Sequence, residues 1–200
     1  SLNSTTGTVT LQGGSVSQCS ARALYVYNTT TGGITVTGSR LEGTSSYTVE
    51  LYYANPAGIS ITNSQLLSGA AYAVIATYAP AYAGQSATFT NNWWGTTDPV
   101  AIQQKILDYA DGYPSGLRIQ YEPFLDGPNG TPRIGIYLRN TPVQSFIPVQ
   151  ESFALDLFTL EPANWTTTFR DSLGQIVRTM TASNTANFLV TWNGTRDDGT

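Results

Sequence analysis

Short segments in which apolar and polar residues alternate recur along the first half of the chain. Each has a leading apolar residue, and these residues are Val9, Ile34, Ile59 and Ala87, spaced by 25, 25 and 28 positions. Alternation with a period of two predicts strands that bury one face. Each segment ends in a residue that tolerates left-handed backbone angles. This predicts chain corners at Gly13, Gly38, Asn63 and Asn91.

Two further apolar columns keep the same spacing. The second consists of Val16, Leu41, Leu66 and Trp94. The third is offset by about half a turn and consists of Leu24, Val49 and Val74. Helical periodicity would not keep three such columns in phase. The pattern therefore predicts stacked coils of about 25 residues, with parallel strands roughly 4.8 Å apart.

A segment rich in large and turn-forming residues follows the repeats and predicts an end cap. An open coil end exposes unpaired backbone groups and apolar core, which a later segment must cover. Asp98 and Pro99 fit the N-cap and first position of a helix that we expect to run to about Ala110. The predicted structural cap consists of Asn91, Asn92, Trp93, Trp94, Gly95 and Asp98. The alternative for the two tryptophans is a sugar-binding site.

The end of the repeat region also resembles a known family. The order Asn-Asn-Trp-Trp-Gly, a short helix and a strand ending in Pro-Phe-Leu is similar to the closing segment of right-handed parallel β-helices. This repeat is shared by pectate-lyase-like and many bacterial surface proteins, and the similarity covers about residues 1–125. It implies an all-β fold, namely a right-handed parallel β-helix of about three to four coils that is capped by a short α-helix.

The second half of the chain has a different pattern. Residues 126–150 are expected to form a linker and the first strand or strands of another domain, because Asp126 to Thr131 is rich in turn formers. A hairpin turn is predicted at Asp171–Gly174. Regular short strands, which favour a β-sandwich, are predicted at Arg133–Arg139, Phe153–Phe158, Trp165–Arg170, Ile176–Thr181 and Phe188–Trp192.

Residues 151–200 resemble the immunoglobulin-like domain of the flagellar hook-capping family, which recurs in secreted bacterial proteins. The shared pattern is a strand, a D-x-x-G turn, a strand containing Val177-Arg178, and then Trp192-Asn193-Gly194 followed by Asp197 and Gly199. A further strand follows in that family. The resemblance therefore implies an immunoglobulin-like β-sandwich that is incomplete at Thr200.

Composition narrows the class of protein. Charged residues make up only 11% of the 200 positions and hydrophobic residues 40%, which is enough to build a core and suits an all-β secreted or cell-surface protein. A net charge of −4 with scattered basic residues argues against nucleic acid. No apolar run is long enough to span a membrane. The single cysteine, Cys19, excludes an intramolecular disulfide.

Side chains suited to catalysis are scarce in the repeats. The charged residues among positions 1–95 are Arg22, Arg40, Glu42 and Glu50. Lyases of this fold need a carboxylate cluster for calcium, and glycosidases need paired carboxylates. We therefore expect no catalytic residue, no metal and no cofactor. Arg40 and Glu42 are expected to form a surface ion pair.

Tyrosines are better candidates for binding. Strand alternation places Tyr25, Tyr27 and Tyr52 on the outer face, where Tyr27 and Tyr52 should stack on adjacent coils. Tyr78 and Tyr82 lie in the stretch that lengthens the last coil, and such loops often carry function. These five tyrosines are candidates for stacking on sugar rings or on a protein partner. The alternative is that they only stabilise the sheet.

Three hypotheses about function remain open. The chain is a non-catalytic structural or adhesive portion of a large secreted or cell-surface protein, with a β-helix stalk and a docking domain, and it builds into a filament or surface layer. Alternatively, it is the C-terminal part of a polysaccharide lyase or hydrolase whose active site lies upstream. In the third hypothesis it is a carbohydrate-binding module. The partner classes are polysaccharide, other surface proteins and further copies of the chain.

Overall fold

The fold is taken from a computed structural model that describes residues 2–3, 7–29, 31–44, 47–69, 71–139, 145–147 and 150–199. The chain divides into two compact units, Ser1–Ile134 and Gly135–Thr200, and each has its own hydrophobic cluster. Parts of the predicted linker, residues 140–144 and 148–149, lie outside the described residues.

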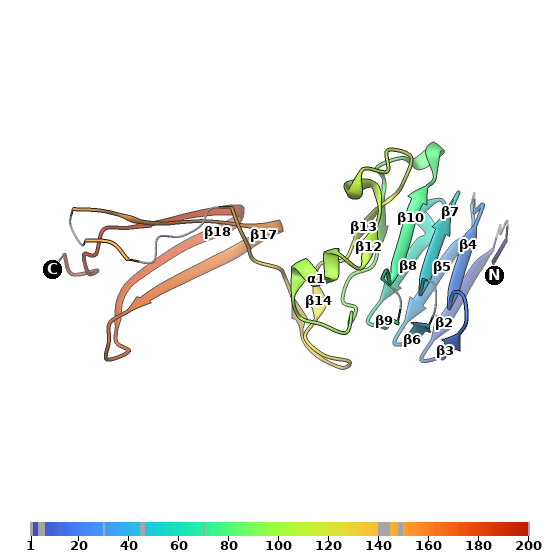
Figure 1. Cartoon of the computed structure of the whole chain (residues 1–200), viewed down its shortest axis with the longest axis horizontal. Coiled ribbons are helices and arrows are strands. Elements are labelled where there is room, and N and C mark those ends of the chain that lie inside the picture. Colours follow the sequence, from blue (N-terminus) through green and yellow to red (C-terminus); the bar gives the residue numbers. More distant parts are fainter. Residues whose placement is uncertain are drawn as a thin grey trace. The chain divides into compact units, whose positions relative to one another are not determined.

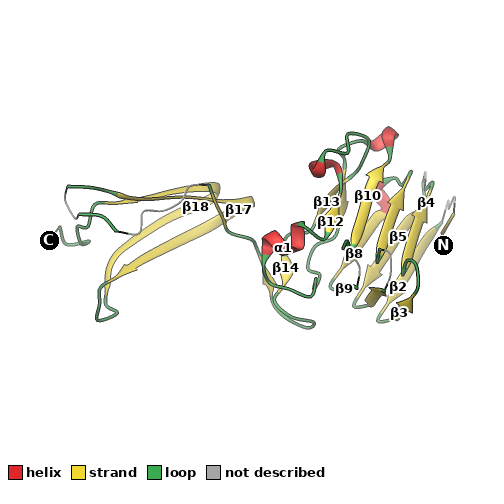
Figure 2. Ribbon diagram, viewed as in Figure 1, coloured by secondary structure: helices red, strands yellow, loops and turns green. Residues whose placement is uncertain are grey.

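The first unit is a parallel β-solenoid of about three turns between residues 8 and 88 (Figures 1 and 2). Three sheets form its walls. The first has the order β13 (Arg118–Gln120), β11 (Ser86–Thr88), β8 (Ile59–Thr62), β5 (Gly33–Thr37) and β2 (Thr8–Gln12). The second has β3 (Ser15–Cys19), β6 (Arg40–Gly43) and β9 (Gln65–Ser68). The third has β1 (Leu2–Asn3), β4 (Leu24–Tyr27), β7 (Val49–Tyr52), β10 (Val74–Tyr78) and β12 (Ile106–Leu107).

The apolar columns of the sequence pair in the predicted register. Ile34 lies opposite Val9 on one side and Ile59 on the other. The second and third columns pair in the same way, for example Leu41 with Leu66. Ile34, Leu41 and Leu66 are almost fully buried. The predicted repeat of about 25 residues, its parallel strands and its inward-facing columns are therefore confirmed.

The predicted corners are also confirmed. Their residues have φ angles in the left-handed region, with values of 63° at Gly13, 57° at Gly38, 51° at Asn63 and 56° at Asn91. Glycine and asparagine adopt this region more easily than other residues. The same backbone bend therefore recurs once per turn and keeps the adjoining strands in register.

The residue after each corner belongs to a column of hydrogen bonds inside the solenoid. The amide of Gly14 donates to the Ser39 hydroxyl over 3.2 Å, and the amide of Ser39 donates to the Ser64 hydroxyl over 3.1 Å. The amide of Ser64 donates to Oδ1 of Asn92 over 2.9 Å. These side chains satisfy backbone groups that would otherwise be buried without a partner, which is costly in an apolar interior.

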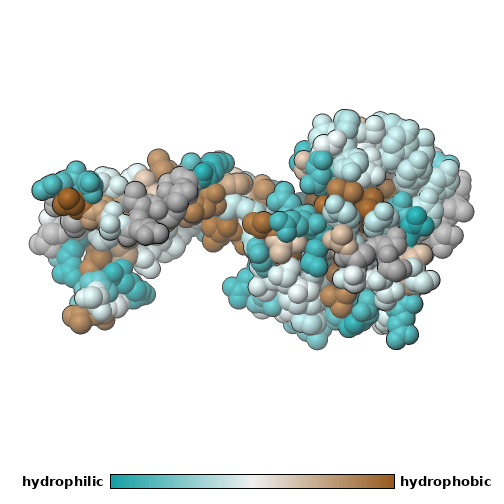
Figure 3. Space-filling view, in the orientation of Figure 1, coloured by the Kyte–Doolittle hydropathy of each residue, from teal (hydrophilic) through white to brown (hydrophobic). Residues whose placement is uncertain are grey.

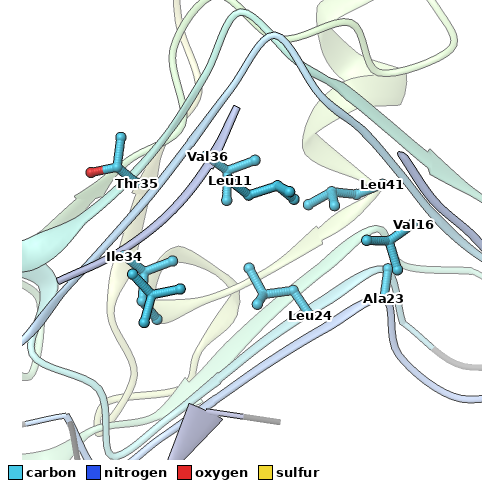
Figure 4. Close-up of a pocket in the computed structure, with 9 residues that line it drawn as sticks. Leu11, Val16, Ala23, Leu24, Ile34, Thr35, Val36 and Leu41 are labelled. Carbon is cyan, nitrogen blue, oxygen red and sulfur yellow. The ribbon is translucent and has the colours of Figure 1, made fainter. Parts of the chain in front are cut away.

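The core thins toward the first turn. Strand β5 alternates between half-buried and buried residues, whereas the residues of β2 alternate between exposed and half-buried. An apolar cavity of about 70 Å³ opens among the first and second turns, and its lining side chains Leu11, Leu24 and Leu41 extend into the space between the three walls (Figure 4). The cavity therefore lies at the end of the solenoid where the core is less completely packed.

The segment after the third turn closes the solenoid in a different way from the one predicted. Helix α1 (Pro99–Gln103) starts as expected, because the Asp98 side chain accepts a hydrogen bond from the amide of Val100 over 3.0 Å. It ends after five residues, so the predicted capping helix to Ala110 is wrong. Ile106 instead pairs with Val74 as part of β12. The free edge of β10 offers backbone partners that a longer helix would leave unused.

Asp108 stabilises the loop between β12 and β13. Its carboxylate accepts hydrogen bonds from the amides of Ala110 and Ile119, each over 2.7 Å, and its own amide donates to Asp111 over 3.1 Å. The residue is only 4% exposed. Burial raises the pKa of the Asp108 carboxyl above its usual 3.8, although the two amide hydrogen bonds act in the opposite direction.

A raised pKa makes solenoid stability depend on pH. Between the ordinary pKa and the raised one, the folded state holds the Asp108 proton more tightly than the unfolded state does. The free energy of unfolding therefore falls as pH rises through that window. We expect Asp108→Asn to remove this part of the pH dependence, because the amide does not titrate. Urea unfolding of both proteins across a pH series measures it, and parallel pH profiles would contradict the assignment.

The predicted turn at Asp126 to Thr131 connects two short antiparallel strands, β14 (Phe124–Leu125) and β15 (Pro132–Arg133). The Asp126 carboxylate accepts from the amide of Thr131 over 2.7 Å and pairs with Arg133 over 2.9 Å. These hydrogen bonds and the ion pair lower the pKa of Asp126. The segment that the sequence predicts as a linker or turn is therefore a hairpin turn, and it is stabilised by hydrogen bonds and an ion pair of Asp126.

The described residues of the second unit form one antiparallel sheet. Its order is β16 (Tyr137–Leu138), β17 (Phe153–Arg170) and β18 (Ile176–Trp192). The predicted hairpin turn is confirmed, because the amide of Gly174 donates to the carbonyl of Asp171 over 2.9 Å and Gly174 has a φ of 79°. Trp165, Phe188 and Val190 form the buried centre of this unit.

The strands of this unit are longer than predicted. Phe153–Phe158 and Trp165–Arg170 belong to one strand, β17, and the two predicted segments after the turn belong to β18. The register shifts between Phe158 and Ala163, so Pro162 sits at an irregularity, a position that proline tolerates, and does not end the strand. Among the described residues there is no second sheet, so the structure does not confirm an immunoglobulin-like sandwich.

Candidate functional site

The third wall of the solenoid places tyrosines on successive turns. Strands β4, β7 and β10 bury Val26, Leu51 and Ala76. In β4 and β7 the positions beside Val26 and Leu51 therefore face away from the core. In β10 a register shift between Ile75 and Tyr78 brings Tyr78 to the corresponding outer position. Tyr27 lies opposite Tyr52, and Tyr52 lies opposite Tyr78. The sequence predicts the alignment of Tyr27 with Tyr52, and the structure confirms it.

The aligned rings form a stacked column. The ring centres of Tyr27 and Tyr52 are 5.9 Å apart with an angle of 9° between their planes, and those of Tyr52 and Tyr78 are 5.3 Å apart with an angle of 25°. Tyr25 adjoins the column, with its ring centre 6.0 Å from that of Tyr27. Both faces of the Tyr52 ring are thus turned toward neighbouring rings.

A fifth tyrosine, Tyr53, completes the group. Its ring is nearly perpendicular to the column and lies 5.0 Å from the Tyr52 ring and 4.8 Å from the Tyr78 ring. Its hydroxyl is hydrogen-bonded to that of Tyr78, and this bond raises the pKa of Tyr53 to about 12. We call Tyr25, Tyr27, Tyr52, Tyr53 and Tyr78 the tyrosine cluster.

Tyr53 was missed by reasoning from strand alternation because it occupies a corner. Its φ is 53°, and Asn28 has a φ of 52° at the corresponding corner of the preceding turn. The left-handed region suits asparagine but strains a tyrosine. The spacing of 25 residues from Asn28 could have predicted the corner. A bulky residue in a strained conformation is a reasonable marker of function.

A charged pair borders the tyrosine cluster. The Arg22 guanidinium lies over the Tyr25 ring at 4.7 Å and forms an ion pair with Glu50 of the next turn. Burial first, and then the Glu50 carboxylate, raise the pKa of Tyr25. Glu42 forms the predicted ion pair with Arg40 over 2.9 Å. Both glutamates of the repeats are therefore held by arginines.

The other predicted binding residue is separate from the tyrosine cluster. Tyr82 lies in the short 3-10 helix Pro80–Tyr82, where it packs against the solenoid core. The cluster thus contains four of the five predicted tyrosines and adds Tyr53.

The predicted cap residues occupy the end of the third turn. Asn92 and Trp94 are buried, Trp93 is half-buried and pairs with Gln65, and Gly95 has a φ of 80°. Trp94 is 1% exposed and its ring meets that of Tyr121 edge-on at 6.3 Å. It therefore has no surface to offer a sugar, and the alternative site would have to use Trp93.

The tyrosine cluster can bind but offers little for catalysis. Tyr27, Tyr53 and Tyr78 are 37%, 38% and 37% exposed. Because the rings of the column stack on one another, it presents mainly ring edges and phenolic hydroxyls to solvent. Such groups combine apolar contact with hydrogen bonding. On the face that Figure 3 shows, the first unit is mostly pale or teal, the colours of neutral and hydrophilic residues, with smaller brown areas.

Neither a metal-binding cluster nor a membrane-spanning helix is present among the described residues. No group of three or more histidine, cysteine, aspartate or glutamate side chains is arranged to hold a metal ion there. No helix in the described ranges has the length and hydropathy needed to cross a membrane. In comparisons with known proteins, no family, curated protein or solved structure matches this chain.

Proposed function

We propose that this chain is a non-catalytic, adhesive and structural part of a secreted or cell-surface protein, and that the tyrosine cluster is its binding surface. The observation that carries the proposal is the alignment of exposed Tyr27, half-buried Tyr52 and exposed Tyr78 on three successive turns. Tyrosine is enriched at protein interfaces because one side chain supplies both apolar area and a hydroxyl.

The solenoid supports this role mechanically. Each turn is bonded to the next along three walls, and corner residues and buried hydroxyls fix the register. Repeats of this kind form rigid elongated surfaces because each repeat packs only on its neighbours. A rigid support lowers the entropy cost of holding several rings in place for a partner.

The partner classes are polysaccharides and other surface proteins. Stacking of a sugar ring needs a free aromatic face, and the rings of the column turn their faces toward one another. The exposed edges and hydroxyls favour a partner rich in hydrogen-bonding groups. A carbohydrate-binding module is the second candidate, because sugar hydroxyls supply such groups at high density. A lyase or hydrolase would need carboxylates other than Glu42 and Glu50, which are paired with arginines.

Two finer interpretations belong to this proposal. One is right-handed winding of the solenoid, as in the β-helices that residues 1–125 resemble. The other is an immunoglobulin-like docking role for residues 151–200. Strands β16 to β18 supply one antiparallel sheet, and a sandwich would require a second sheet over one of its faces. Exposed Leu160, Ile176 and Leu189 are the apolar residues that such a sheet could cover.

Binding to glycans and surface proteins tests the proposal. The wild-type chain is applied to a glycan array and to immobilised cell-surface extracts, and compared with the double variant Tyr27→Ala, Tyr52→Ala. We expect the double variant to lose at least about tenfold in affinity, because buried interface tyrosines commonly contribute more than about 1 kcal/mol each.

A matched control keeps this test specific. Tyr113 is 39% exposed and lies outside the cluster, so Tyr113→Ala should bind like the wild type. Circular dichroism must show that each variant keeps the β-sheet spectrum. Equal binding by the wild type and the folded double variant would contradict the proposal.

A further inference from the structure

Two residues of the tyrosine cluster have a geometry that bears on chemistry other than binding. The ring centres of Tyr53 and Tyr78 are 4.8 Å apart, and their planes meet at 85°. Their hydroxyls are joined by a hydrogen bond. Both side chains are more than a third exposed, so a small oxidant in solution can reach either ring.

This arrangement resembles the product of oxidative tyrosine coupling. In dityrosine, a carbon–carbon bond joins the two ring carbons next to the hydroxyl-bearing carbons. The hydroxyls then flank the new bond, within hydrogen-bonding distance of each other, and the rings are twisted apart. The ring centres of Tyr53 and Tyr78 are 4.8 Å apart, the shortest such distance in the tyrosine cluster. This pair therefore needs less movement than the others to bring the two ring carbons into contact.

We propose that Tyr53 and Tyr78 are a modification site at which a one-electron oxidant, such as a haem peroxidase with hydrogen peroxide, forms an intramolecular dityrosine bond between successive turns. Each phenol loses one electron and its hydroxyl proton, and the two phenoxyl radicals combine at the adjacent ring carbons. The proton on each of these carbons then returns to the phenolic oxygen. Overall, two hydrogen atoms leave the protein and one peroxide molecule becomes two water molecules.

The stacked ring pairs are less suited to this coupling. The two other perpendicular pairs have more distant ring centres, at 5.0 Å for Tyr52 with Tyr53 and 6.3 Å for Tyr27 with Tyr53. Tyr27 and Tyr52 stack at 9°, and Tyr52 and Tyr78 at 25°. A bond between two stacked rings would require one of them to rotate out of the column. The site is also the only place in the tyrosine cluster where a corner residue faces a strand residue of the next turn, since Tyr53 has a φ of 53°. The strained corner thus positions the reacting ring.

The chain has few sulfur-containing side chains that would compete with the tyrosines for the oxidant. The chain has one cysteine and one methionine, and Cys19, in the first solenoid unit, is half-buried. A Cys19→Ser background removes the thiol without touching the tyrosine cluster.

The test exposes dilute Cys19→Ser protein to haem peroxidase and hydrogen peroxide. We expect the blue fluorescence of dityrosine in the monomer band of a denaturing gel, and an intact mass lower by two hydrogen atoms. Trypsin leaves both tyrosines on one peptide, because no lysine or arginine lies between Arg40 and Lys105. Chymotrypsin, which cleaves after Leu67, should instead release two peptides joined through Tyr53 and Tyr78.

Conservative variants decide the assignment. Tyr53→Phe keeps the ring but removes the hydroxyl, and should lower monomer fluorescence at least tenfold, whereas Tyr52→Phe should retain it. Tyr78→Phe serves the same purpose if Tyr53→Phe does not fold. Fluorescence only in cross-linked dimers, a joined peptide pair from other tyrosines, or an unchanged yield in Tyr53→Phe would overturn the proposal. The result is independent of whether the tyrosine cluster binds a glycan or a protein.

Discussion

Replacing Asn92 by alanine should lower the free energy of unfolding of the solenoid by about 3–6 kcal/mol. Nδ2 of Asn92 donates to the carbonyls of Ile61 and Phe89, each over 2.7 Å, and its Oδ1 accepts from the amide of Ser64. The residue is fully buried. Alanine removes these three hydrogen bonds to backbone groups, and each loss costs about 1–2 kcal/mol in a buried site. Urea unfolding followed by tryptophan fluorescence measures the loss.

Two other variants separate this effect from a general loss of packing. Serine occupies the corresponding position in the two preceding turns, at Ser39 and Ser64. Asn92→Ser keeps an acceptor for the Ser64 amide, so we expect about half the loss. Asn91→Gly should cost less than about 1 kcal/mol, because glycine adopts the left-handed corner freely. An Asn92→Ala protein as stable as the wild type would contradict the role of the hydrogen-bonded column.

Replacing Trp94 by alanine should cost about 3–5 kcal/mol of stability. Trp94 is 1% exposed and belongs to the solenoid core together with Phe89 and Tyr121. Removing a buried tryptophan loses its transfer free energy and leaves a cavity that the rigid turns cannot fully close. Thermal unfolding measured by circular dichroism should show a midpoint several degrees lower.

Trp94→Phe and Trp93→Ala are the matched controls. The indole Nε1 of Trp94 has no hydrogen-bond partner among the described residues, so phenylalanine removes an unsatisfied donor along with some volume. We expect it to lose less than half of what alanine loses. Trp93 is half-buried, and its alanine variant should lose less than about 2 kcal/mol. Equal losses at the two tryptophans would contradict the packing described for this end of the solenoid.

Sequence periodicity was enough to predict the solenoid because every turn repeats the same requirement. An inward residue such as Ile34 must match Val9 and Ile59 above and below it, and the register cannot slip without exposing the whole column. The corners at Gly13, Gly38, Asn63 and Asn91 could be predicted as well, since left-handed angles favour glycine and asparagine. The spacing of the apolar columns therefore allows the solenoid fold to be predicted from the sequence.

The errors arose where tertiary contacts outweighed local signals. The residues around Ile106 have helical spacing, but they form a strand that pairs with the free edge of β10. Pro162 resembles a strand terminator, but an irregularity in β17 accommodates it. Neither the sheet edge nor the register shift is visible in the sequence near these residues.

Only part of the candidate site could be predicted from the sequence. Strand alternation identifies Tyr27 and Tyr52, whose neighbours are fixed by the repeat. It does not identify Tyr53, because a corner lies outside the alternation. It also does not separate Tyr82 from the cluster, since the packing of the lengthened last turn decides where that ring lies.

The most direct test of the tyrosine cluster as a binding surface is a nuclear magnetic resonance titration. The protein, with isotope-labelled tyrosine rings, is titrated with the glycan or surface protein that the binding screen retains. We expect the ring signals of Tyr27, Tyr52, Tyr53 and Tyr78 to shift together and saturate at one affinity, while the Tyr113 signal stays unchanged. Saturable binding that leaves the signals of these four rings unchanged would contradict a binding role for the tyrosine cluster.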